Sequence, residues 1–159
     1  MTFTRASDDS PAYIGGSDIE SRIRVAELLD RYLVSLDQQV LDADWAAALF
    51  TPDAVVAFPI SRHEGLAGMA EYHATALSAF AATMHLGSPA VVEVHDDTAT
   101  LLANLMSTHV PHGAQEDACQ LFVTGTSVHG RARHTPLGWR LSELDFRLVW
   151  SQGIPPGRA

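Results

Sequence analysis

The stretch that decides the fold spans residues 30–53 and reads DRYLVSLDQQVLDADWAAALFTPD. Its first part continues an apolar pattern at three- and four-residue steps, which predicts one amphipathic helix over residues 17–38. The apolar stripe expected to face the core is Ile19, Ile23, Ala26, Leu29, Leu33 and Leu36. Asp42 or Asp44 then caps a short second helix that carries Trp45. The stretch therefore predicts two consecutive helices, with a strand to follow.

Downstream of this stretch, the hydrophobic period changes from helix-like to strand-like. A short strand is expected at 54–60, a turn at 63–65 and a third helix at 66–80. Further strands are expected at 84–95, 98–110, 120–130 and 139–152, with a tight hairpin turn at Asp96-Asp97. In the last strand the apolar even positions are Leu144, Phe146, Leu148 and Trp150. Helices segregated from an antiparallel sheet predict the α+β class, and a sheet bent around the long helix would leave room for a small ligand.

The chain has the length and composition of one globular domain. It has 159 residues, of which 47% are hydrophobic and 18% charged. We expect the folded domain at 17–152. Residues 1–16 are polar, with Pro11 and a Gly-Gly pair, and are expected to form a flexible leader. Residues 153–159 are expected to form a short tail.

Charge and cysteine content exclude several classes of function. The net charge of −9, with only 10 Lys and Arg, disfavours a nucleic-acid interface and docking on anionic membranes. No apolar run approaches the ~20 residues of a membrane-spanning helix. Cys119 is the single cysteine, so no intramolecular disulfide can form, which agrees with an expected cytoplasmic location.

The sequence lacks the common motifs that indicate a nucleotide site, a serine nucleophile or a metal site. It has no glycine-rich phosphate loop and no GxSxG nucleophile elbow. It also has no HxH, HExxH or CxxC spacing for a metal site. We therefore expect neither a cofactor nor a metal ion.

Four segments resemble the SnoaL-like branch of the NTF2-like superfamily. They are Arg31-Tyr32 to Asp37, WAAALFTPDAV at 45–55, HLGSP at 85–89 and GWRL at 138–141. The resemblance covers about residues 17–152. It implies a cone-shaped α+β barrel with three N-terminal helices packed on a curved, mostly antiparallel sheet, and a homodimer formed through the outer sheet face. The superfamily includes ketosteroid isomerases, scytalone and bile-acid dehydratases, polyketide cyclases, a dehydrochlorinase and non-catalytic binding modules, so fold does not choose the function.

The same resemblance implies a set of site residues. Dehydratase and dehydrochlorinase members carry a Tyr or an Asp on the first helix and a His on the strand after the third helix. Tyr32, Asp37 and His85 match those places, and His109 matches a second histidine of scytalone dehydratase. The third-strand aspartate of the bile-acid dehydratase and the base aspartate of ketosteroid isomerases have no clear equivalent here, which leaves the exact reaction open.

These residue types suit acid–base chemistry. An imidazole exchanges protons near neutral pH, and a carboxylate on its other nitrogen fixes the tautomer. The hypothesis is that His85 is the general base and acid, Asp37 orients it, and Tyr32 polarises a substrate oxygen. Each residue also has a purely structural explanation: a helix-end aspartate in solvent, a core histidine bonded to backbone, and a core tyrosine.

The expected ligand is a lipophilic small molecule of polyketide, terpenoid or steroid size. The residues expected to contact it are His109, Trp45, Phe58, Met69, Tyr72, Phe122 and Phe146. The leading interpretation is a cofactor-independent dehydratase, isomerase or cyclase acting on a hydrophobic carbonyl compound. The alternatives are a non-catalytic ligand-binding or assembly module, and an epoxide hydrolase, whose Asp/Arg/Asp set has no evident match.

Overall fold

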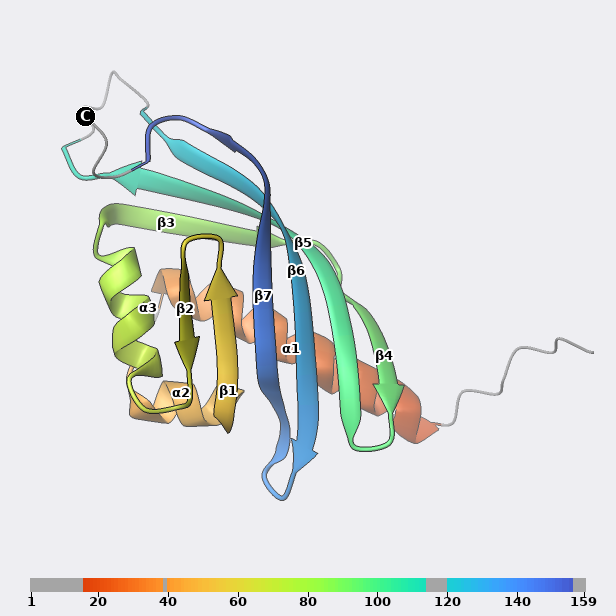
Figure 1. Cartoon of the computed structure of the whole chain (residues 1–159). Helices are drawn as coiled ribbons and strands as arrows, with labels where there is room; N and C mark the ends of the chain where they lie inside the picture. Colours follow the sequence, from red (N-terminus) through yellow and green to blue (C-terminus); the bar gives the residue numbers. More distant parts are fainter. Residues whose placement is uncertain (1–15, 39, 114–119, 156–159) are drawn as a thin grey trace, which may run out of the picture.

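The computed structural model describes residues 16–38, 40–113 and 120–155. Three helices lie against one face of a seven-stranded sheet whose long strands bend over α1 (Figure 1). The helices are α1 (Gly16–Gln38), α2 (Ala43–Leu49) and α3 (Met69–Leu77). The strands are β1 (Phe50–Phe58), β2 (Ser61–Glu64), β3 (Phe80–Gly87), β4 (Val91–His95), β5 (Thr98–Pro111), β6 (Phe122–Thr135) and β7 (Gly138–Gln152). The predicted α+β class is confirmed. Cys119, most of the expected leader and part of the expected tail lie outside the described residues.

The sheet is mixed and open. Its order is β2-β1-β7-β6-β5-β3, and β4 also pairs with β5. Only β1 and β7 pair in parallel, and the other pairs are antiparallel. Because β2 and β3 form the two edges, the helices complete a cone that the sheet alone does not close.

The single strand expected at 84–95 is wrong. β3 begins earlier, at Phe80, and pairs with residues 105–111 of β5, whereas β4 pairs with residues 98–102. Pro89 lies in the break between the two strands, and a proline has no N–H to continue a ladder. The expected turn between β4 and β5 is confirmed, with Asp96 in the left-handed region at φ 52°.

Other predicted boundaries also shift. β1 starts directly after α2, at Phe50, although the second helix was expected to end at residues 51–53. The turn expected at 63–65 is mostly strand β2, which forms a hairpin with β1. The third helix is shorter than 66–80 because Gly68, at φ 77°, immediately precedes it and β3 has begun by Phe80. β6 extends past the predicted residue 130 to Thr135.

The expected alternation along β7 fails at its end because of a β-bulge. Thr126 pairs with Leu148 but Gly125 pairs with Trp150, so Val149 is an extra residue. The inner face thus carries Phe146 and Leu148, whereas Trp150 turns to the outer face and covers Gly125.

The core lies between α1 and the inner sheet face. Val25, Leu29 and Leu33 are buried on α1 and pack with residues such as Leu101 and Leu144 from the sheet. The predicted stripe is wrong at its start, since Ile19 and Ile23 are half-exposed and the buried face of α1 instead includes Val25 and Leu28. Among the helices that the structure describes, none has the length and apolar character needed to cross a membrane.

Candidate acid–base site

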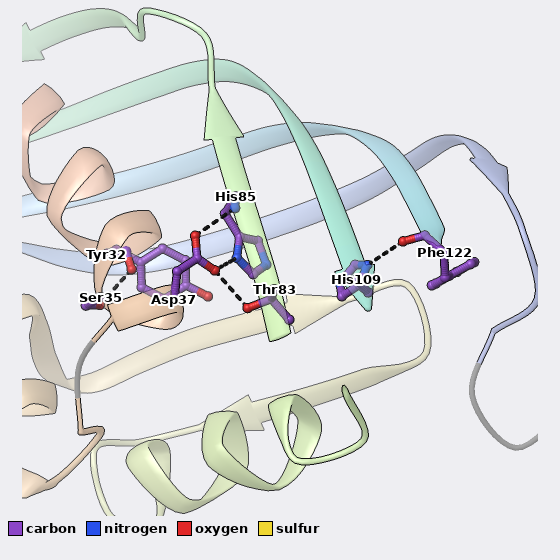
Figure 2. Close-up of polar contacts among 7 residues, drawn as sticks. All are labelled: Tyr32, Ser35, Asp37, Thr83, His85, His109 and Phe122. Atoms are coloured by element: carbon purple, nitrogen blue, oxygen red, sulfur yellow. Dashed lines mark hydrogen bonds and ion pairs between the residues drawn. The ribbon is translucent and has the colours of Figure 1, made fainter. Parts of the chain in front are cut away.

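The end of α1 brings a carboxylate onto strand β3. Asp37 is the second-to-last residue of α1, and its Oδ1 lies 2.7 Å from Nδ1 of His85 (Figure 2). The Asp37 side chain is 14% exposed and the His85 side chain 8%. An ionised carboxylate can only accept, so Nδ1 carries the hydrogen, and in the neutral ring this tautomer has its lone pair on Nε2. The structure thus brings together two of the three residues predicted to act in catalysis.

Two further donors hold the same carboxylate. The Thr83 hydroxyl donates to Oδ1 at 2.8 Å, and the backbone N–H of His85 donates to Oδ2 at 2.8 Å. Residues 83 and 85 share one face of β3 because side chains alternate along a strand. Sequence reasoning missed Thr83, and its position two residues before His85 was the signal that could have found it.

A second imidazole lies beside the first. The rings of His85 and His109 have centroids 5.9 Å apart and are perpendicular. Nδ1 of His109 donates to the carbonyl oxygen of Phe122 at 3.0 Å (Figure 2), so its Nε2 is also an acceptor. Burial lowers the pKa of His109, and the neighbouring His85 lowers it too, against the Phe122 carbonyl and Asp37. His109 is therefore neutral at neutral pH.

Apolar rings and one hydroxyl complete this neighbourhood. The His109 ring lies near the rings of Phe80 and Phe122, with centroid distances of 4.4 Å and 5.5 Å. Ser107 lies directly opposite His85 in the β3–β5 ladder and is buried on the same face. Its hydroxyl makes no hydrogen bond to the residues described. Ser107 was not among the predicted site residues, because only the strand register places it there.

The structure places the predicted site residue Tyr32 in the core, where its hydroxyl meets His73 and not the pair of Asp37 and His85. Its side chain is fully buried, and its hydroxyl lies 3.0 Å from Nε2 of His73. Nδ1 of His73 donates to the carbonyl oxygen of Met69 at 2.8 Å, so Nε2 accepts the Tyr32 proton. Burial raises the pKa of Tyr32 and lowers the pKa of His73 to about 4. Tyr32 and Asp37 are five residues apart on α1, so their side chains point about 140° apart around the helix axis. Tyr32 therefore faces the core.

Most residues expected to contact the ligand belong to the core as well. Trp45, Met69 and Phe146 are buried, and Phe58 and Tyr72 pack against them. All but Met69 make ring contacts in the aromatic cluster around Tyr32 and His73. Of the expected set, His109 lies beside His85, and Phe122 lies beside His109. Sequence periodicity identifies an inward-facing residue, but it cannot distinguish a packed core from a cavity wall.

Two surface hollows of similar size are formed by described residues. One of about 350 Å³ lies beside Leu86, Met106 and Trp150. The other, of about 320 Å³, lies between α1 and α2 beside Arg31 and Trp45. Neither is lined by Asp37 or His85. Within 16–38, 40–113 and 120–155, no three His, Cys, Asp or Glu side chains gather to hold a metal ion.

Comparisons with known proteins agree with this architecture. Residues 17–145 match the model of a family described as SnoaL-like domain. An NTF2-like superfamily protein from Salmonella enterica is 20% identical, with 88% of this chain and 99% of that chain covered and a TM-score of 0.70. No curated protein matches this chain.

Two solved structures of named enzyme types have the same fold. A candidate scytalone dehydratase from Novosphingobium aromaticivorans is 16% identical, covers 90% of this chain and 95% of its own, and has a TM-score of 0.69. A hexachlorocyclohexane dehydrochlorinase, LinA-type3 from Novosphingobium barchaimii, is 15% identical, with 86% and 91% covered and a TM-score of 0.71. At these identities the likeness establishes the NTF2-like fold alone, which confirms the fold implied by the sequence.

Proposed function

Because the chain belongs to the SnoaL-like domain family, we propose that it is a cofactor-independent lyase that removes water from a neutral, hydrophobic carbonyl compound. The observation that carries the proposal is the 2.7 Å contact between Asp37 and Nδ1 of His85. The names of two structural neighbours, a candidate dehydratase and a dehydrochlorinase, both describe eliminations, which supports this choice of reaction class.

The reaction begins with His85 as the base. Its Nε2 takes a proton from the carbon next to the substrate carbonyl, and Asp37 stabilises the imidazolium that forms. The electron pair of the broken C–H bond then forms a C=C bond as the neighbouring C–O bond breaks. The imidazolium returns its proton to the leaving oxygen, so water departs and His85 is neutral again. The dyad therefore supplies both proton transfers.

Neighbouring groups hold the substrate during these steps. Nε2 of His109 accepts a hydrogen bond from the substrate hydroxyl, since its other nitrogen donates to Phe122. The hydroxyl of Ser107, opposite His85, donates to the substrate carbonyl in place of Tyr32. Phe80 and Phe122 supply apolar surface. Among the described residues, the hydrogen-bond partners of Asp37 and His85 include no Arg or Lys, which favours a neutral substrate over an anionic one.

A second candidate function is a non-catalytic ligand-binding or assembly module. The observation in its favour is that the two hollows of about 350 and 320 Å³ lie away from Asp37 and His85. Epoxide hydrolysis is less well supported. It uses an Asp/Arg/Asp set, whereas the described partners of Asp37 are Thr83 and His85.

The proposal is tested with cyclic β-hydroxy ketones of two to four rings, incubated in D₂O and followed by NMR. We expect the wild type to form the enone and to exchange deuterium at the carbon next to the carbonyl. His85→Gln should lower turnover by about 10²- to 10⁴-fold, the usual contribution of a general base. His129→Gln is the matched control, because His129 pairs with the outward-facing Leu102.

Turnover of His85→Gln equal to that of the wild type would refute the base assignment. If the wild type neither forms the enone nor exchanges deuterium with any ketone, native mass spectrometry of the purified protein provides the second arm. A retained small molecule, together with no turnover, would favour the binding module over the lyase.

A further inference from the structure

We propose that Thr83 is a positioning residue that fixes the tautomer of His85 by acting through Asp37. Its catalytic meaning rests on the proposed function, whereas its effect on the imidazole can be measured without a substrate. The juxtaposition that carries the inference is one carboxylate with three donors from two residues of β3 (Figure 2).

The Asp37 carboxylate needs an external restraint. Rotation about the terminal bond of an aspartate side chain is soft and roughly two-fold, so the two oxygens readily exchange places. Asp37 also stands at the end of α1, one residue before the last helical position. Local helix geometry therefore does not decide which oxygen faces His85.

The edge of the sheet supplies the first restraint. In the part of the chain that the structure describes, β3 is the last strand on its side, and its outer edge pairs with no other strand. The backbone N–H of His85 finds its acceptor in Oδ2 of Asp37 at 2.8 Å. This bond holds one oxygen but leaves the other free to move about it.

Thr83 supplies the second restraint. Its hydroxyl donates to Oδ1 at 2.8 Å, and the same oxygen accepts from Nδ1 of His85 at 2.7 Å. A carboxylate oxygen has two lone pairs and can accept both donors. With both oxygens held, Oδ1 has a fixed position that only the Nδ1–H tautomer can satisfy. That tautomer leaves the lone pair of Nε2 for the substrate proton.

Removal of the Thr83 hydroxyl should loosen this arrangement. Thr83→Val keeps the β-branched shape that suits a strand and deletes only the donor. The ring of a free histidine side chain in water favours the Nε2–H tautomer. We therefore expect the Nε2–H form of His85 to rise several-fold in Thr83→Val, which would direct an N–H, in place of a lone pair, at the substrate.

The experiment is ¹H–¹⁵N NMR of the full chain labelled at histidine, which reports the tautomer of each ring. Wild type and Thr83→Ser should show His85 mainly as Nδ1–H, since serine keeps the hydroxyl. Thr108→Val is the matched control. Thr108 pairs with Met84 in the same ladder, one residue out of phase with the Ser107 that faces the dyad, so it lies on the outer face. Wild-type ¹⁵N shifts of His85 in Thr83→Val would overturn the proposal.

Activity separates this inference from the proposed function. In Thr83→Val we expect kcat to fall about tenfold and KM to stay within about twofold, with recovery in Thr83→Ser. A tautomer change with no wild-type turnover would support the positioning role and reject the lyase. Loss of turnover in His85→Gln, with unchanged tautomer and kcat in Thr83→Val, would do the reverse. If Thr83→Val does not fold, Thr83→Ala provides the same comparison.

Discussion

At the scale of single residues, two histidines have contrasting surroundings. His85 is bonded to a carboxylate at the edge of the sheet, whereas His73 is buried and bonded to a hydroxyl and a carbonyl. Burial lowers the pKa of His73 to about 4, from an ordinary value of 6.5. The pair of Asp37 and His85 carries the proposed acid–base role, and His73 is part of the core.

This buried histidine makes stability depend on pH. Between pH 6.5 and about 4 the unfolded chain binds a proton at His73 that the folded chain does not, so stability falls as pH falls through this window. The loss should reach up to about 3 kcal/mol at pH 4. Urea unfolding at pH 7 and pH 4.5 measures it. His73→Gln should lose less stability over the same interval, and an equal loss would assign the effect to other groups.

The resemblance sufficed to predict the pair of Asp37 and His85, because helix and strand positions alone specify which elements meet. It did not indicate that Tyr32 faces the core, since a position on the first helix does not say which side of the helix the residue occupies. Thr83 lies two residues before His85 on the same strand, so strand alternation alone places both on one face. The position of Ser107 opposite His85 depends on strand register, and the break between β3 and β4 hid that register.

At the scale of elements, the local sequence predicted the start of a helix better than the course of a strand near its end. Asp42 caps α2 by accepting the N–H of Trp45 at 2.8 Å, as its sequence position suggested. The bulge at Val149 had no comparable signal, because apolar residues occupy both sides of it. The position of Trp150 on the outer face therefore follows only from the register between β6 and β7.

Two glycines of β6 should respond differently to an added methyl group. A Cβ at Gly130 would lie 2.8 Å from Cγ of Leu101 and 3.1 Å from a methyl of Leu144, both in the core. Gly130→Ala should cost about 1–3 kcal/mol by overpacking. A Cβ at Gly125 would instead meet the ring of Trp150, which is half-exposed and can swing outward.

Chemical unfolding of Gly130→Ala and Gly125→Ala, side by side, tests this difference. The Gly125 variant should lose the smaller amount of stability and change the fluorescence of the chain. A larger loss in Gly125→Ala would mean that Trp150 is held rigidly on the outer face.

At the scale of the whole molecule, the outer sheet face exposes a group of apolar side chains. Met84 and Leu86 lie there on β3, next to Met106 on β5 and Trp150 on β7, and all four are more than 40% exposed. Exposed apolar groups of this kind often mark an interface. The homodimer through this face therefore remains a proposal with a defined surface.

A charge placed on this face should separate the subunits. We expect the wild type to sediment as a dimer and Met106→Glu as a monomer, because burial of an unpaired carboxylate opposes association. Leu137→Glu is the control, since Leu137 is exposed in the turn between β6 and β7. Analytical ultracentrifugation decides the matter, and a wild-type monomer at micromolar concentration would reject the interface.

The hydrogen bond from the backbone N–H of His85 to Asp37 also has a structural consequence. It connects the C-terminal end of α1 to the edge strand β3. A design that transfers the proposed acid–base pair to another scaffold should therefore include the whole arrangement: the helix end with its aspartate, the threonine, and the histidine two residues after it. Transfer of the aspartate and the histidine alone would omit the threonine hydroxyl that we propose to position the carboxylate.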